Sequence, residues 1–101
     1  PKRYVVDVDV PNAVVTVGDE VELFRPSMIV TTPTWVGEVV AGTVRVQTSA
    51  HGATQRAAIT LDDGTVVVDW ETPQRRIAPG QSVVFYDVDD LRVLGGGIAA
   101  A

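Results

Sequence analysis

The chain has 101 residues, of which 46% are hydrophobic and 21% charged, and this size and composition are those of one globular domain. They exclude a disordered chain, a bilayer-spanning apolar run and a core large enough for an elaborate cofactor cavity. With no cysteine and a formal net charge of −5, the sequence also excludes thiolate chemistry and disulfides, and it disfavours a nucleic-acid binder that acts alone. Residues 1–3 lead into alternating valines rather than a secretory signal, so we expect a cytoplasmic protein.

Apolar residues, most of them valine, recur at every second position over most of the chain, a period typical of β-strands rather than helices. In chain order, the predicted strands cover residues 4–10, 14–17, 28–32, 43–48, 56–61, 65–70, 82–86 and 91–94. Residues 20–24 fit either a strand or a single helical turn. Pro33 is expected to end the strand over residues 28–32. Trp35, just beyond, is large enough to plug the end of a small core.

The segments between the strands carry turn residues. Asp62-Asp63-Gly64 predicts a hairpin between two alternating runs, and Ala78-Pro79-Gly80-Gln81 suits a type II turn because glycine accepts a positive φ at the third position. Residues 49–53 are predicted to form a loop, and residues 73–76 a connection. The triple glycine at 95–97 lacks the lysine and the helix of a phosphate loop, so we expect it to permit close packing at a corner.

Short strands separated by turns every ~8–12 residues, with no long helical pattern, predict an all-β protein, a small antiparallel β-barrel or sandwich. No internal repeat or low-complexity segment interrupts this pattern. The one candidate boundary lies at residues 25–27, and it separates an opening β-hairpin over residues 1–26 from a barrel domain over residues 27–101.

Few residues offer chemistry of their own. His51, the only histidine, has no cysteine or nucleophilic serine motif to assist it, so we expect a solvated side chain rather than an acid or base. The acidic groups at residues 7–9 and 87–90 lack the ligand spacing of a calcium loop, and they should bond local backbone or water. Arg75, Arg76 and Gln81 flank one rigid turn, where they suit contacts to phosphate, sugar or base edges and equally suit a merely solubilising surface.

The end of the chain resembles one family. Residues 77–87, Ile-Ala-Pro-Gly-Gln-Ser-Val-Val-Phe-Tyr-Asp, followed by Val-Leu-Gly-Gly-Gly-Ile at 93–98, are similar to the C-terminal end of the bacterial tRNA-specific 2-thiouridylases. Residues 4–9 and 15–18 resemble the last hairpin of that family's central domain, and Trp35 resembles a tryptophan near the entry to its C-terminal barrel. The resemblance covers almost the whole chain but only the final part of such an enzyme, so we expect a C-terminal fragment.

The resemblance implies a division of labour within the longer protein. In this family an N-terminal domain uses ATP to activate the wobble uridine of tRNA, and a cysteine persulfide delivers sulfur, so the parent is expected to be a tRNA-uridine 2-sulfurtransferase served by a sulfur-relay protein. This chain has neither the family's nucleotide loop nor a cysteine, and we expect it to be inactive alone, with no cofactor or metal of its own. Its barrel, expected to be similar to the second domain of elongation factor Tu, would hold the tRNA anticodon region beside the catalytic and central domains.

Carried over residue by residue, the resemblance implies a tRNA contact at Gln81, the glutamine that follows Pro-Gly. A second contact region of the family, usually Arg-Tyr-Arg, falls on Gln47, Thr48 and Ser49, where neutral groups replace charge-assisted phosphate contacts. The candidate phosphate partners are Arg45, Arg75 and Arg76.

Two other interpretations remain open. A structural or protein-interaction barrel would stabilise a neighbouring domain without touching RNA. An independent enzyme built around His51 and the acidic residues would need a deep pocket with a strongly shifted titrating group. Neither a membrane nor DNA is expected as a partner.

Overall fold

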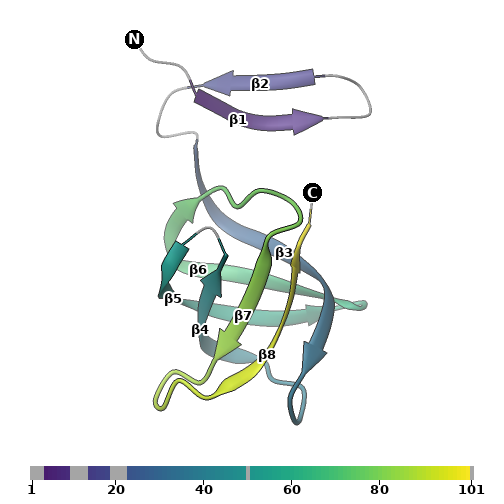
Figure 1. Ribbon diagram of the computed structural model, residues 1–101, viewed down its shortest axis with the longest axis vertical. Helices are drawn as coiled ribbons and strands as arrows, with labels where there is room; N and C mark the ends of the chain where they lie inside the picture. The colour runs from purple at the N-terminus through teal and green to yellow at the C-terminus, as the bar shows by residue number, and fades with distance from the viewer. Residues whose placement is uncertain (1–3, 10–13, 19–22, 50, 101) are drawn as a thin grey trace.

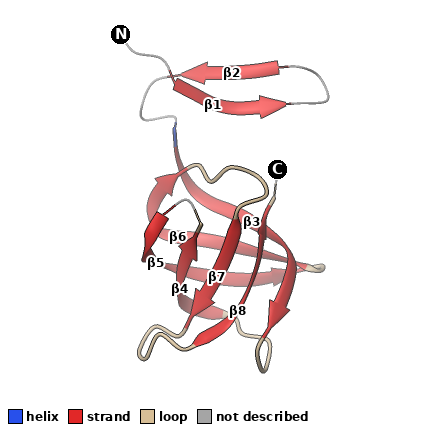
Figure 2. Cartoon of the chain, viewed as in Figure 1, coloured by secondary structure: helices blue, strands red, loops and turns tan. Residues whose placement is uncertain are grey.

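The computed structural model describes residues 4–9, 14–18, 23–49 and 51–100, with the backbone alone for residues 4–9, 14–18 and 51. Strands β1 (Tyr4–Asp9) and β2 (Val14–Gly18) pair antiparallel in a sheet of their own, as expected for the opening hairpin. Six further strands close an antiparallel barrel in the order β3-β6-β5-β4-β7-β8 (Figures 1 and 2). They are β3 (Phe24–Trp35), β4 (Gly42–Thr48), β5 (His51–Asp62), β6 (Thr65–Arg75), β7 (Ser82–Tyr86) and β8 (Val93–Ala99). The predicted all-β barrel is confirmed.

The barrel core follows the alternation seen in the sequence. Along β4, Val44, Val46 and Thr48 are buried, whereas Arg45 and Gln47 on the opposite face are only half-buried. Valine suits such a wall because its branched Cβ packs well on a pleated surface, and each fully buried valine contributes roughly 1.5–3 kcal/mol by leaving water. The buried hydrophobic residues are Val30, Val44, Val46, Ala57, Ile59, Val66, Val68, Trp70, Ile77, Val83, Phe85 and Ala99.

Two predicted turns are confirmed by their backbone angles. Between β5 and β6, Asp62 pairs with Thr65, and the two residues of the loop, Asp63 and Gly64, have φ values of 46° and 82°. Positive φ at both positions is the signature of the two-residue hairpin whose twist matches the flanking strands. Before β7, Gly80 has a φ of 90° and the Gln81 N–H donates to the Ala78 carbonyl at 3.3 Å, as a type II turn requires.

One end of the barrel, which we call the sealed end, is closed by aromatic packing. The rings of Trp35 and Phe85 stack with centroids 5.7 Å apart and planes 25° from parallel, and both Trp35 and Leu94 pack against the core. The glycines of β8 permit this closeness. A Cβ on Gly95 would meet the Thr34 carbonyl oxygen and lie 2.8 Å from the Trp35 ring, and one on Gly97 would lie 2.5 Å from Val30. Close packing is therefore confirmed for the triple glycine, but its expected place at a corner is wrong, because residues 95–97 lie within β8.

Several predicted strand limits are wrong, and each for a visible reason. Strand β3 does not end at Pro33 but continues to Trp35, because its pairing with β8 is irregular between Thr31 and Thr34 and needs no proline N–H there. Strand β8 begins at Val93 rather than residue 91, because Leu91 has a φ of 56° and belongs to a turn.

The loop and the connection predicted around the barrel are also shorter than expected. Strand β5 already begins at His51, inside the loop expected over residues 49–53. Strand β6 continues to Arg75 because Phe24 and Arg25 at the start of β3 pair with Arg75 and Gln74. In both cases a partner strand distant in sequence extends the element.

The start of β3 bears on the domain division. This strand crosses the boundary expected at residue 26, so residues 24–26 contribute to the barrel, and the assignment of the preceding hairpin to another domain stays a prediction. Among the described residues, no helix has the length and apolar character needed to span a membrane.

Candidate functional site

The end of the barrel opposite the sealed end is open, because two strand ladders bulge there. On the β4–β5 ladder, Val46 faces Gln55 and Thr48 faces His51, so residues 52–54 oppose Gln47 alone. On the β3–β6 ladder, Arg25 faces Gln74 and Ser27 faces Asp69, so residues 70–73 oppose Pro26 alone. Extra residues in one strand of a pair re-aim side chains, and such bulges are frequent at the rims of barrels and beside binding sites.

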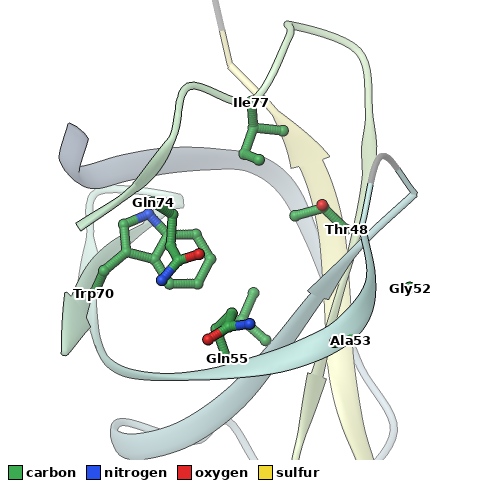
Figure 3. Close-up of a pocket in the computed structure, with 8 residues that line it drawn as sticks. Thr48, Gly52, Ala53, Gln55, Trp70, Gln74 and Ile77 are labelled. Carbon is green, nitrogen blue, oxygen red and sulfur yellow. The ribbon is translucent and has the colours of Figure 1, made fainter. Parts of the chain in front are cut away.

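The two bulges border a cavity of about 330 Å³, which we call the mouth. It is lined by Val46, Thr48, Gly52, Ala53, Gln55, Trp70, Gln74 and Ile77. Figure 3 shows Trp70 and Gln74 side by side on one wall, Thr48 on the opposite wall and Ile77 beside the connection to β7. A volume of this size is at the lower end of the ~300–1,000 Å³ typical of small-molecule sites.

Several polar atoms of the mouth have no hydrogen-bond partner among the described residues. Thr48 is only 5% exposed, and its hydroxyl is the one buried side-chain polar atom with no hydrogen bond among the described residues. The Gln55 amide makes no hydrogen bond within the described part of the chain, and Gln74 uses only its amide nitrogen, which donates to the Thr72 carbonyl at 2.8 Å. A buried polar group without a partner costs about 1–3 kcal/mol, so this arrangement favours a ligand or water that completes the bonds.

A second hollow of about 320 Å³ adjoins the mouth and shares Trp70 and Ile77 with it. Its charged side chains are Arg25, Arg75 and Arg76, and we call it the arginine hollow. Among the described lining residues of the mouth and of this hollow there is no carboxylate. Three arginines thus line a hollow beside the mouth although the chain as a whole carries −5, and Arg25 and Arg76 also make interactions elsewhere.

Two of the sequence-predicted contact residues brace the β5 bulge from outside. The Arg45 guanidinium donates from Nε to the Thr54 hydroxyl at 2.7 Å and from Nη2 to the Thr54 carbonyl at 3.0 Å. The Gln47 amide donates to the Gly52 carbonyl at 2.7 Å and accepts from the Tyr86 hydroxyl at 2.7 Å. These bonds hold the bulge in place, and they use two of the five guanidinium N–H donors of Arg45 and one of the two amide N–H donors of Gln47.

Gln81 lies nearby, at the start of β7. Its side-chain oxygen accepts a hydrogen bond from the Ser49 hydroxyl, and that hydroxyl also accepts from the Ser82 N–H at 3.2 Å. Ser49 and Ser82 further border a shallow hollow of about 260 Å³ together with Gln47 and Thr48. The structure therefore places Gln47 and Thr48 in the wall of this hollow, with Gln81 bonded to the lining residue Ser49, and it places Arg75 and Arg76 in the separate arginine hollow.

The acidic turn before β8 is satisfied locally. One Asp87 carboxylate oxygen accepts from the backbone N–H groups of Asp89 and Asp90 at 2.9 and 3.3 Å, and the other lies 3.6 Å from the Arg92 guanidinium. These bonds, the Asp89 N–H first, lower the pKa of Asp87. Within the described residues no group of three or more His, Cys, Asp or Glu side chains could hold a metal ion. The side chains of His51, Asp7 and Asp9 lie outside the described residues.

Sequence reasoning missed the mouth. Gln55 and Trp70 occupy inward-facing positions of their strands, and the periodicity that predicts core residues cannot tell a core wall from a cavity wall. A glutamine in phase with the buried Ala57 and Ile59 is the one local signal that could have marked it. Arg25 gave no signal, because it was assigned to a boundary rather than to a strand.

Comparison with known proteins identifies relatives of this barrel. The family described as the aminomethyltransferase beta-barrel domain matches residues 25–99. The tRNA-specific 2-thiouridylase MnmA of Herpetosiphon aurantiacus is 38% identical over 96 residues, which cover 93% of this chain and 26% of the relative. Its counterpart in Chloroflexus aggregans is 39% identical over 99 residues, with 94% and 27% covered. That of Streptomyces coelicolor is 37% identical over 101 residues, with 98% and 26% covered.

These matches confirm the resemblance to the tRNA-specific 2-thiouridylases. The chain spans about a quarter of the length of the curated relatives it matches.

Proposed function

The chain belongs to the aminomethyltransferase beta-barrel domain family, and on that premise we propose that it is the tRNA-binding accessory domain of a tRNA-specific 2-thiouridylase. The observation that carries the proposal is the match of 93% to 98% of this chain to three enzymes with that name. The parent would be a transferase that converts the wobble uridine of tRNA to 2-thiouridine.

The chemistry of sulfur transfer would lie outside this chain. A cysteine persulfide has to come from elsewhere, because the chain has no cysteine. ATP would likewise bind to the parent's catalytic domain, and a sulfur-relay protein would supply that domain. The contribution of the barrel would be to hold the anticodon region of tRNA, which linkage to the catalytic domain makes efficient even when the barrel alone binds weakly.

The arrangement of charge supports this accessory role. A net charge of −5 opposes the approach of phosphate, so the isolated chain should bind tRNA weakly and with strong salt dependence. The arginine hollow offers guanidinium groups that bind phosphate in a forked geometry, away from any described carboxylate in its lining. Such a local site suits a domain that orients RNA already captured by its neighbours.

Gln81 is the residue to test first. Its side-chain oxygen already accepts from Ser49, so its two amide N–H donors are the groups left for a phosphate or a base edge. In the 2-thiouridylase that carries this barrel, Gln81→Ala should weaken tRNA binding several-fold in a filter-binding assay and leave ATP binding unchanged. Thr60→Ala, at an exposed position on β5, is the control. Unchanged tRNA affinity in the Gln81 variant would count against the contact.

One observation favours the alternative of a structural barrel without RNA contact. Val36, Val93 and Ile98 are exposed apolar residues around a shallow hollow over the glycines of β8, and Val36 is 74% exposed. Apolar residues gathered on a surface suit a contact with a neighbouring domain. If this were the only role of the barrel, nuclease footprinting of tRNA bound to the enzyme would show no protection that depends on the barrel.

A further inference from the structure

We propose that the mouth and the arginine hollow together bind one unstacked nucleotide of single-stranded RNA, with the base in the mouth and its phosphate over the arginines. This inference rests on the proposed tRNA-binding function and specifies the site at which a looped-out nucleotide would be held. It assigns roles to Gln55 and Trp70, which the family resemblance did not single out.

The mouth has the chemistry that a nucleobase requires. Bases present donors and acceptors on one edge and an apolar face, and proteins recognise unpaired bases by aromatic contact together with hydrogen bonds. The Gln55 amide and the Thr48 hydroxyl each offer both a donor and an acceptor, and neither makes a hydrogen bond among the described residues. Trp70 supplies the aromatic wall and Ile77 an apolar one (Figure 3).

The unpartnered Thr48 hydroxyl is what distinguishes this cavity from an ordinary gap in a core. Thr48 is 95% buried, and the valine that fills the equivalent inward positions on β4 would have the same shape without an unbonded oxygen. The two bulges point the same way, because residues 52–54 and 70–73 both leave their ladders at the rim of this one cavity. These are the two longest interruptions of pairing in the barrel, since the shifts on β3–β8 and β7–β8 each insert only one extra residue.

The phosphate part of the proposed site follows from the position of the arginine hollow next to the mouth. The arginine hollow shares Trp70 and Ile77 with the mouth, so the two hollows are neighbours at this end of the barrel. Arg75 is exposed, and within the described residues its side chain has no hydrogen bond or ion pair. A base-sized polar cavity beside a cationic hollow matches a nucleoside carrying a phosphate better than it matches an apolar ligand or a free anion.

Titration of the 15N-labelled full chain at low salt tests the site directly. Each of the four ribonucleoside 5′-monophosphates and a single-stranded pentauridylate are the probes, and the two indole N–H signals report the two ends of the barrel. We expect at least one mononucleotide and the oligonucleotide to shift the Trp70 indole and the Gln55 amide saturably, while the Trp35 indole stays in place. Equal shifts at both tryptophans, or no saturable shift with any probe, would overturn the proposal.

Variants separate the two halves of the site. Gln55→Ala and Thr48→Val should each weaken mononucleotide binding at least fivefold, with Thr60→Val as the exposed control. Arg75→Gln should abolish the preference for a mononucleotide over its unphosphorylated nucleoside, whereas Arg92→Gln should not, because Arg92 lies in the β7–β8 turn at the other end of the barrel (Figure 1). A nucleotide preference that survives Arg75→Gln would refute the phosphate assignment.

The tRNA measurement distinguishes this inference from the function on which it rests. If the parent enzyme binds tRNA in a barrel-dependent manner but Gln55→Ala and Thr48→Val bind as well as the unsubstituted protein, the mouth is not the contact and the inference fails alone. If the mononucleotides saturate the mouth but the barrel contributes nothing to tRNA affinity, the nucleotide site stands and the accessory tRNA role fails.

Discussion

The two tryptophans of this protein stand at opposite ends of one barrel and meet different surroundings. Trp35 stacks on Phe85 over glycines that allow the strands to approach closely, and that end is sealed. Trp70 lies beside a bulge, among amides and a hydroxyl, and that end is open. Pairing is irregular at both ends, but glycines at the sealed end let a large ring fill the space, whereas the longer bulges at the open end leave the same kind of ring lining a cavity.

The difference shows how a small barrel can combine stability with a site. Its modest core cannot sustain unsatisfied polar groups everywhere, and the described structure confines the one unpartnered buried side-chain oxygen to the mouth. The packing at the sealed end should therefore contribute most to the free energy of unfolding, whereas the unpartnered polar groups of the mouth should lower it. Four substitutions test this contrast, and they follow from the largest expected effect to the smallest.

Removal of the Phe85 ring should destabilise the protein most. Phe85 is fully buried, so Phe85→Ala should lower the free energy of unfolding by about 3–5 kcal/mol through lost burial and the cavity left behind. Urea denaturation followed by circular dichroism measures the change, with Val36→Ala at an exposed site as the control. A loss below about 1 kcal/mol would mean that the sealed end is not the stabilising one.

A methyl group added to a glycine of β8 should have the second-largest effect on stability. A Cβ on Gly96 would meet the Val83 carbonyl oxygen and lie 3.3 Å from the Val84 Cα, and neither backbone atom can move aside easily. Gly96→Ala should therefore cost about 2–3 kcal/mol in the same denaturation assay. Gly37→Ala, where nothing lies within 4 Å of the added carbon, should be nearly neutral. Equal effects at both glycines would contradict close packing as the cause.

At the mouth, a substitution should stabilise the protein rather than destabilise it. Thr48→Val replaces an unpartnered buried hydroxyl by a methyl group of similar size, and it should raise the free energy of unfolding by about 1 kcal/mol. Thermal unfolding detects the gain, and Thr60→Val on the exposed face of β5 controls for a general effect of valine in strands. Destabilisation by Thr48→Val would show that the hydroxyl is satisfied in solution.

The smallest effect should come from the acidic turn beside the sealed end, and it depends on pH. Because folding lowers the pKa of Asp87, its carboxylate contributes stability that is complete above the ordinary aspartate pKa of about 3.9 and is lost as the pH falls through the lowered value. Asp87→Asn should therefore lower the melting temperature slightly at pH 7, and the difference should shrink in strong acid. Asp69→Asn on an exposed strand face controls for net charge, and a gap that widens in acid would contradict the assignment.

The sealed end and the barrel itself could be predicted from sequence because their causes are local. Alternating valines specify inward and outward faces, and Asp63-Gly64 and Pro79-Gly80 specify turns through their own backbone preferences. The triple glycine predicts close packing, although it does not predict that the neighbours are Thr34 and Val83. Each of these signals lies within a few residues of the structure that it predicts.

The mouth could not be predicted because its causes are distant. In the β6 bulge, residues 70–73 lie opposite a single residue of β3, Pro26. Nothing in the sequence of residues 70–73 predicts that they face this residue. The adjacency of Arg25 to Arg75 likewise depends on which strands pair. Resemblance pointed to Gln47 and Thr48, which line one hollow, and to Gln81, which bonds to Ser49 of the same hollow. It gave no indication that Arg45 would donate to Thr54.

The closure of the barrel by its last strand has a consequence for biosynthesis. Strand β8 joins β7 to β3, so Val30 pairs with Ala99 across nearly the whole length of the barrel sequence. Until residues 93–99 have left the ribosome, β3 and β7 expose unpaired edges that can recruit other chains. Contacts so far apart in sequence also fold slowly, so the nascent barrel should depend on chaperones or on its neighbours to shield those edges until the final strand arrives.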